Sequence, residues 1–280
     1  MPTMRVVNVK THGARGDGAA DDTDAFNEAL RAAQGGRLKV PAGHYMINAI
    51  KSIRPLSNTV IELNDEAVLE VIPNAETRYK LIRLHDCDDV KIRGGTLKGD
   101  RQKHQCTDGE WGMGIHVGSG CTRITLQNVQ SREMWGDGFY IGGKVVPREV
   151  TIRDCTADFN RRQGLSVVAG VQIKILGNRF SNTRGTRPEN GIDIEPDRGR
   201  PGVSDVWIEG NRFVNNGQAG IEIAGKWATV SNVTILKNHF HGQRPLKVKH
   251  VSSDYKQSSV SKLLCSFQSY RLEATDCCVP

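Results

Sequence analysis

Three acidic residues, Asp193, Glu195 and Glu222, are the sharpest candidates for acid–base chemistry in this sequence. Asp193 and Glu195 stand two positions apart in an alternating segment, so on a strand they share one face, with Cα atoms about 7 Å apart. Glu222 holds the place of Asp193 in the next copy of that segment. Hydrolysis of a glycosidic bond uses two carboxyl groups about 5–5.5 Å or 6.5–9.5 Å apart. The spacing therefore predicts a polysaccharide hydrolase in which these three residues are catalytic.

A second set of residues suits proton abstraction from a uronic acid. Such a reaction needs an acid, a base and a neutralised carboxylate. His116 and Tyr140 would take or give the proton, and Asp137 would orient either of them. The cations that would neutralise the carboxylate or hold an anionic chain are Arg161, Arg162, Lys226 and Arg187. A uronan lyase or C5-epimerase is therefore an alternative, just behind the hydrolase.

The charge balance and two tryptophans point to the partner. The net charge is +7, and a basic surface attracts polyanions. Trp135 and Trp227 lie near the ends of the same set of segments, where their rings would stack on sugars. These features predict an acidic polysaccharide as the partner. A non-catalytic glycan-binding module would use the same surface, and it stands as a third hypothesis.

These residues belong to an internal repeat. A phrase of Gly, an apolar residue, a variable residue and then Val or Ile returns at intervals of 24 to 29 residues. A second alternating phrase lies between its copies, and Asn-x-Phe follows the last three of these. Short alternating strands that recur at this period cannot bury an apolar face alone, so they stack turn on turn. The repeat predicts an all-β fold, a single-stranded parallel β-helix. The glycines of the first phrase are Gly114, Gly138, Gly164, Gly191 and Gly220.

Stacking the turns places the candidate residues in columns. We expect the asparagines of Asn-x-Phe to form an internal amide ladder and the phenylalanines to stack inside. The repeated glycines are expected at bends, where a positive φ is needed. Small residues above and below Glu195 predict a trough for a linear polymer. One outward column contains His116, Tyr140, Ser166, Asp193 and Glu222. A second contains Gly118, Gly142, Val168, Glu195 and Ala224.

A helix is expected before the repeat and an irregular tail after it. Residues 23–33 follow Asp21 and Asp22, which suit a helix N-terminus, and they carry an apolar stripe. One helix ahead of a solenoid predicts an N-terminal cap over the open end of the core. The repeat pattern stops after Phe240. We therefore expect the β-helix over residues 1–243 and an irregular tail over 244–280. The tail would be either foreign or out-of-frame sequence or a C-terminal cap.

Residues 13–18 (Gly-Ala-Arg-Gly-Asp-Gly), 21–26 (Asp-Asp-Thr-Asp-Ala-Phe) and 40–45 (Val-Pro-Ala-Gly-His-Tyr) closely resemble the opening of the pectate-lyase-like superfamily. That group includes rhamnogalacturonases, polygalacturonases, alginate epimerases and phage tailspikes. The resemblance implies a right-handed β-helix that acts on polysaccharides, secreted or virion-associated, and bacterial or phage in origin. It implies a trimer if the protein is tailspike-like, and Ca²⁺ only if it is a lyase. The epimerase motif has only an echo at residues 135–138.

Several classes of function are disfavoured. Six per cent aromatic residues leave few stacking platforms, and no zinc-finger, homeodomain or RNA-recognition signature occurs, so we expect no nucleic-acid partner. No apolar run is long enough for a membrane span. Residues 1–10 lack the apolar core of a signal peptide. The seven cysteines show no C-x-x-C spacing, so neither a metal site nor a disulfide framework is expected.

Overall fold

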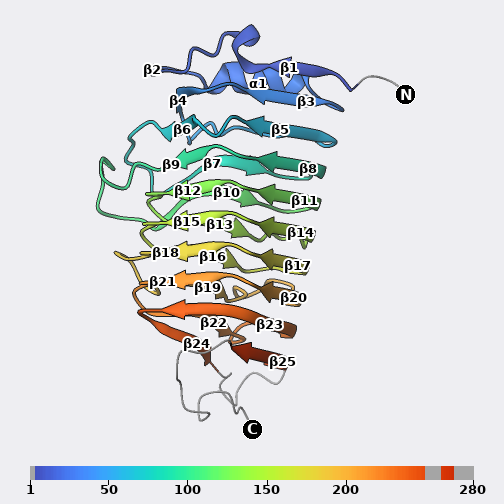
Figure 1. The fold of residues 1–280 in the computed structure, drawn as a ribbon, viewed down its shortest axis with the longest axis vertical. Helices are drawn as coiled ribbons and strands as arrows, with labels where there is room; N and C mark the ends of the chain where they lie inside the picture. The colour runs from blue at the N-terminus through green and yellow to red at the C-terminus, as the bar shows by residue number, and fades with distance from the viewer. Residues whose placement is uncertain (1–3, 250–259, 268–280) are drawn as a thin grey trace.

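The chain folds into a parallel β-helix with an N-terminal helical cap. The computed structural model describes residues 4–249 and 260–267. Each turn contributes strands to up to three sheets, and the turns stack in chain order from the N-terminal to the C-terminal end (Figure 1). The predicted all-β solenoid is confirmed. No helix among the described residues is long and apolar enough to cross a membrane.

We name the three sheets A, B and C. The first two turns alternate between sheets A and B; from the third turn on, a strand of sheet A is followed by one of B and then one of C, and every recorded pairing is parallel. Sheet A contains β1 (Val6–Asn8), β3 (Arg37–Val40), β5 (Thr59–Leu63), β8 (Asp88–Arg93), β11 (Thr122–Gln127), β14 (Arg148–Arg153), β17 (Gly170–Leu176), β20 (Val203–Glu209), β23 (Val230–His241) and β25 (Val260–Phe267). Sheet B contains β2 (Asp17–Asp21), β4 (Gly43–Ile47), β6 (Ala67–Val71), β9 (Thr96–Lys98), β12 (Gln130–Arg132), β15 (Thr156–Asp158), β18 (Arg179–Ser181), β21 (Arg212–Val214) and the C-terminal part of β23, which continues from sheet A. Sheet C contains β7 (Arg78–Leu84), β10 (Trp111–Val117), β13 (Asp137–Ile141), β16 (Gln163–Val167), β19 (Asn190–Ile194), β22 (Ala219–Ala224) and β24 (Arg244–Lys249).

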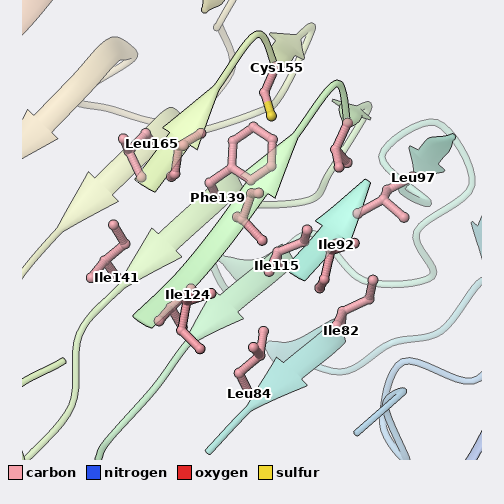
Figure 2. Close-up of a cluster of buried hydrophobic side chains, with 14 of the residues drawn as sticks. Ile82, Leu84, Ile92, Leu97, Ile115, Ile124, Phe139, Ile141, Cys155 and Leu165 are labelled. Atoms are coloured by element: carbon pink, nitrogen blue, oxygen red, sulfur yellow. The ribbon is translucent and has the colours of Figure 1, made fainter. Parts of the chain in front are cut away.

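The interior is a continuous apolar column built from alternate residues of each strand. Ile115 pairs with Ile82 of the turn before and Phe139 of the turn after, and all three are buried. Figure 2 shows Ile82, Ile115 and Phe139 from sheet C pointing into the same interior as Ile92 and Ile124 from sheet A. Because neighbouring turns share each apolar contact, burial stabilises the stack and no turn is stable alone.

The asparagine ladder and phenylalanine stack are confirmed. The Asn178 Nδ2 atom donates to Oδ1 of Asn211 at 2.9 Å, and Asn211 Nδ2 donates to Oδ1 of Asn238 at 2.9 Å. Each of these amides also donates to a backbone carbonyl oxygen of the preceding turn, Asn178 to that of Ile152 and Asn211 to that of Ile175, so their buried amide groups are satisfied. The ring centroids of Phe180 and Phe213 lie 5.4 Å apart. The ladder fixes the turn between sheets A and B.

The expected role of the repeated glycines is wrong. Gly114, Gly138, Gly164, Gly191 and Gly220 do not have positive φ. A Cβ atom on Gly164 would lie 2.5 Å from the Gly191 carbonyl oxygen, and one on Gly191 would lie 2.6 Å from that of Gly220. Close approach of the next turn therefore excludes a side chain here, while Asn, Asp and other non-glycine residues take many of the left-handed turn positions.

The N-terminal cap is helix α1 (Thr23–Ala32), which follows a short 3₁₀ helix η1 (Val9–His12). Its predicted apolar stripe is buried against the first turns. The two acidic residues that precede the helix accept hydrogen bonds from different partners. Asp21 accepts hydrogen bonds from the backbone N–H and hydroxyl of Thr23. Asp22 instead accepts from the backbone N–H groups of Arg15 and Gly16, so it closes the loop before the helix.

The boundary expected at residue 243 falls inside the stack. Strand β24 pairs with β22, placing Lys247 beside Glu222, and β25 pairs with β23. The sequence pattern missed these strands because they lack the glycine and Asn-x-Phe phrases. The remainder of the expected tail, residues 250–259 and 268–280, lies outside the described residues.

Replacing Asn211 by alanine should lower the free energy of unfolding by about 2–4 kcal/mol, because the buried partners of its amide lose their hydrogen bonds. Urea unfolding followed by circular dichroism measures this. The control is Gln218→Ala, an exposed amide, which should change the free energy by less than about 0.5 kcal/mol. Equal effects of the two variants would contradict a structural role for the ladder.

Candidate functional site

The predicted column of polar residues on sheet C exists in register. His116 pairs with Tyr140, Tyr140 with Ser166, Ser166 with Asp193, and Asp193 with Glu222. These side chains face away from the apolar interior, but the last three are almost fully buried. The column is therefore not an open trough along its whole length, because neighbouring groups cover its C-terminal part, from Ser166 to Glu222.

Asp137 lies at the centre of this covered part. Its Oδ2 atom accepts a hydrogen bond from the Ser166 hydroxyl at 2.9 Å and pairs with Nη1 of Arg162 at 3.1 Å. Burial raises the pKa of the Asp137 carboxyl, and the charge of Arg162 counters part of that effect. The Arg162 side chain also lies 3.7 Å from the Glu110 carboxylate. The Arg162 guanidinium therefore already pairs with acidic side chains of the protein itself.

Another row of polar residues, which directly precede the repeated glycines, lies beside this column and donates hydrogen bonds to its carboxylates. Asp137 pairs in register with Gln163, and Gln163 with Asn190. Gln163 Nε2 donates to Oδ2 of Asp193 at 2.8 Å, and Asn190 Nδ2 donates to Oε2 of Glu222 at 3.1 Å. The sequence analysis missed Gln163 and Asn190. Both residues directly precede a repeated glycine, and that position is the feature of the sequence that could have identified them.

Asp193 is in an environment that favours its protonated form. The residue is 3 % exposed, and its Oδ1 atom is buried without a hydrogen-bond partner. Burial raises the pKa of Asp193 well above its ordinary value, and the charges of Glu195 and Glu222 raise it further. Glu195 is only half-buried. A protonated carboxyl beside a more accessible one is the arrangement that general acid–base catalysis uses.

Glu222 has the opposite environment. Burial would raise the pKa of its carboxyl, but hydrogen bonds from Lys249, Lys247 and Asn190 outweigh burial and lower it. Lys247 Nζ lies 3.0 Å from Oε2, and Lys249 contacts Oε1. Glu222 is therefore a charged partner of the β24 lysines, which raises the electrostatic cost of ionising Asp193 next to it.

A cationic pocket opens at the N-terminal end of sheet C, on strands that precede those of Asp193 and Glu222. It has a volume of about 450 Å³, and its lining includes Tyr140 and His116. Burial, then the charges of Arg83 and Arg78, lower the pKa of Lys80, as expected where positive charge is concentrated. The basic lining residues are Arg78, Lys80, Arg83, His85, Lys144 and Arg200. The sequence analysis missed those of β7, because that strand precedes the first glycine phrase.

His116 and Tyr140 meet inside this pocket. Their ring centroids lie 5.0 Å apart with an edge-to-face arrangement. His116 Nε2 lies 3.0 Å from the Gly142 carbonyl oxygen, so it carries the proton and Nδ1 has the lone pair. Burial, together with nearby cations, lowers the pKa of His116 to about 4. Burial and then the charge of Asp197 raise the pKa of Tyr140, so both side chains are neutral at pH 7.

Trp135 and Arg161 make contacts within the protein that stabilise the fold. The Trp135 ring is buried and stacks on His104 at 4.1 Å, with the Arg161 guanidinium 3.7 Å from its centroid. Arg161 also donates to the Gly109 carbonyl oxygen at 2.8 Å. These contacts hold the loop before β10 against the sheet. Neither side chain therefore presents a free surface for a sugar ring or a uronate.

The other predicted binding residues lie at the rim. Trp227, in the loop after β22, has Lys226 Nζ 4.5 Å and Arg198 Cζ 5.7 Å from its ring centroid. Arg187 is exposed in the loop between β18 and β19. These residues belong to loops that border sheet C, as expected, and they are not part of the carboxylate cluster. Within the described part of the chain, no group of three or more His, Cys, Asp or Glu residues is placed to hold a metal ion.

Comparison with protein families gives two matches that together follow most of the chain. Residues 75–260 match the right-handed β-helix region. Residues 6–78 match the model described as rhamnogalacturonase A/epimerase, pectate lyase-like. The second match contains the opening motifs on which the resemblance was based.

Individual relatives are larger than this chain. An uncharacterized protein, YclG of Bacillus subtilis, is 26% identical over 247 residues, covering 75% of this chain and 42% of the relative. Mannuronan C5-epimerase AlgE2 of Azotobacter vinelandii is 28% identical over 262 residues, covering 77% and 25%. Gene product 12 of bacteriophage phi29 superposes with a TM-score of 0.78 at 21% identity, covering 93% and 36%. The chain thus spans less than half the length of each.

The opposite pKa shifts predict opposite pH effects on stability. Because the folded pKa of Asp193 is raised, the unfolded chain releases that proton first, and stability falls as pH rises above the unfolded pKa. Asp193→Asn should therefore gain stability relative to the wild type between pH 4 and 8.

The folded pKa of Glu222 is lowered, so its stabilisation is present above the unfolded pKa and lost as pH falls through the folded one. Glu222→Gln should lose stability at pH 7 and approach the wild type in acid. Urea unfolding across this range measures both, and changes of the same sign at pH 7 would contradict the assignment.

Proposed function

Because this chain belongs to the right-handed β-helix family, we propose that it binds an acidic polysaccharide along sheet C and cleaves it by hydrolysis. The observation that carries the proposal is a cationic pocket, lined by Tyr140, that lies two rungs along the same column from a buried carboxyl that favours its protonated form, Asp193. The pocket would hold an anionic sugar, and the carboxyl groups would act on a linkage farther along the same polymer chain.

The relatives support a polysaccharide partner. Several are mannuronan C5-epimerases, and the solved structures of similar fold include a phage tailspike described as a capsular polysaccharide depolymerase and an iota-carrageenase bound to carrageenan fragments. The structural neighbours share 16% and 15% identity with this chain, so they inform the fold alone. Successive rungs lie about 4.8 Å apart, so an extended polymer parallel to the helix axis would contact several strands of sheet C.

The proposed chemistry follows from the two environments. Asp193 would donate its proton to the glycosidic oxygen as the bond from that oxygen to the anomeric carbon breaks. Glu195 would accept a proton from the water that attacks the anomeric carbon. Two positions along a strand separate their Cα atoms by about 6.6 Å, which would allow the two carboxyl groups the wider separation that inversion of configuration uses. Asp137, Arg162 and Ser166 would hold the floor of the site in place.

A second reaction is favoured by one specific observation, the neutral His116–Tyr140 pair inside the cationic pocket. There Arg83 and Lys80 would neutralise a uronate carboxylate. His116 would take the proton next to it, and Tyr140 would return a proton to the carbon or to the leaving oxygen. Return to the carbon gives epimerisation, and transfer to the oxygen with loss of the linkage gives a lyase. The epimerase relatives make this the natural competitor.

Product analysis separates the two reactions. The protein would be incubated with polymannuronate, polygalacturonate and iota-carrageenan while reducing ends and absorbance near 232 nm are recorded together. Hydrolysis predicts new reducing ends without absorbance. Asp193→Asn should reduce that rate by at least about 100-fold, the usual contribution of a general acid. Tyr140→Phe should have a much smaller effect.

Other outcomes identify the alternatives. Absorbance that rises with reducing ends and is lost in Tyr140→Phe would replace hydrolysis with β-elimination. A change in uronate proton resonances without chain cleavage would show epimerisation. Retention of the polymers on the protein without any product would leave a glycan-binding module, the third hypothesis, and refute an enzyme acting on these substrates.

A further inference from the structure

A second groove lies on the outer face of sheet A, which is a different sheet from the one that carries the carboxylates. Its volume is about 970 Å³, about twice that of the cationic pocket. The groove runs across β8, β11, β14, β17, β20 and β23. It therefore follows the helix axis over six consecutive turns, about 24 Å at one rung every 4.8 Å.

Two columns of side chains build this groove, and both follow from the rung register. The floor is one outward position of sheet A, two residues beyond the rim position on each strand. Every rim residue has a φ between 48° and 60°, a left-handed conformation at the second or third residue of its strand. The floor contains Lys91, Thr125, Thr151, Lys174, Trp207 and Thr234. The rim contains Asp89, Arg123, Glu149, Gln172, Asp205 and Asn232.

Trp207 is the distinctive member of the floor. Its side chain is 41 % exposed, although a tryptophan is usually among the more buried residues of a protein. The indole Nε1 donates to Oε2 of Glu209 at 2.8 Å, and Lys237 Nζ lies 3.1 Å from Oε1 of the same carboxylate. The ring is thus held in position on the groove floor while much of its surface stays exposed.

The charges that line this groove cancel. Three cations, Lys91, Arg123 and Lys174, are matched by the acids Asp89, Glu149 and Asp205. Lys91 Nζ lies 3.3 Å from Asp89 Oδ1, and Arg123 pairs with Asp88 below the rim. The lining of the pocket on sheet C is predominantly cationic. The sheet A groove therefore offers hydroxyls, two side-chain amides and balanced charges, without a net field for a polyanion.

We propose that the sheet A groove is a second, separate glycan-binding site that takes an uncharged, hydroxyl-rich polysaccharide chain. Trp207 would stack on the apolar face of one sugar ring. The hydroxyls of Thr125 and Thr151 and the side chains of Gln172 and Asn232 would bond the sugar hydroxyls of neighbouring residues. Each rung contributes one rim and one floor side chain to the groove, so a linear chain along the axis would meet polar protein groups on every turn.

The composition of the lining favours a glycan over a second copy of the chain. The core of a permanent subunit interface is apolar and depleted of charged residues. Here six charged side chains surround one exposed aromatic ring. The proposal does not depend on the chemistry of sheet C, because none of the groove residues belongs to that sheet.

The test is affinity electrophoresis of the full chain in gels that contain dextran, galactomannan, xylan or hydroxyethylcellulose. The wild type should be retarded by at least one of these polymers, and 0.5 M salt should change the retardation little. Trp207→Ala should weaken the apparent affinity by at least about fivefold, whereas Trp207→Phe keeps a ring and should retain most of it. Ile50→Ala removes an exposed apolar side chain of the N-terminal end and should have no effect.

Three results would overturn the proposal. They are absence of retardation in all four gels, equal retardation of Trp207→Ala and Ile50→Ala, and a loss of self-association in Trp207→Ala seen by light scattering. The last would assign the groove to a second copy. If Trp207→Ala does not fold, as judged by its circular dichroism spectrum, Thr151→Met would test the same floor with a longer unbranched side chain. Activity of Asp193→Asn on acidic polymers tests sheet C separately, so failure of one site is distinguishable from failure of the other.

Discussion

Parallel pairing of successive turns, at about 4.8 Å per rung, is the constraint on which the rest of this structure depends. It brings the same position of each turn into direct contact with that position in the next turn. Each residue must therefore be able to pack against, or hydrogen-bond to, its equivalent in the neighbouring turn. Gly191 cannot carry a Cβ because the Gly220 carbonyl oxygen is too close. Asn211 can repeat because its side-chain amide accepts from Asn178 of the preceding turn and donates to Asn238 of the next. Phe213 repeats because flat rings stack.

The same constraint sets the chemistry of the outer faces. On sheet C, acids of adjacent rungs lie one above another, and like charges at that distance raise the cost of ionising both. Asp193 and Glu222 respond differently because Glu222 has two lysines of β24 and Asp193 has a neutral amide from Gln163. In the sheet A groove, positive and negative side chains are equal in number, so their charges cancel. One backbone scaffold thus supports a cationic pocket with buried acids on one side and an electrically balanced groove on another.

The fold and the main polar column could be predicted from the sequence because period and register are local properties. The glycine phrase alone aligned His116, Tyr140 and Asp193 correctly. Exposure could not be predicted in this way, because it depends on what neighbouring columns and loops place over a residue. Trp135 is the clear case. The pattern put it at the edge of the site, but its ring is covered by His104 and Arg161.

Other errors have similar causes. The cations of β7 escaped notice because a strand without a repeated glycine gives no phrase to align, although Arg83 pairs directly with His116. The boundary at residue 243 was placed too early for the same reason, since β24 pairs with β22 through backbone atoms that any sequence provides. The glycines were found correctly but explained by bending, whereas contact between turns is what excludes side chains there.

The central claim is that the cationic end of sheet C holds an acidic polysaccharide. The most direct test is the affinity for polymannuronate, polygalacturonate and iota-carrageenan as a function of salt, compared between a Lys80→Gln, Arg83→Gln double variant and a Lys10→Gln, Lys39→Gln control that removes the same charge from the N-terminal end. Charge attraction in the pocket predicts that the wild type binds at least one polymer, more weakly as salt is added. It also predicts that only the first variant loses at least tenfold in affinity with a shallower salt dependence. Equal losses in the two variants, or no binding of any polymer by the wild type, would contradict the claim.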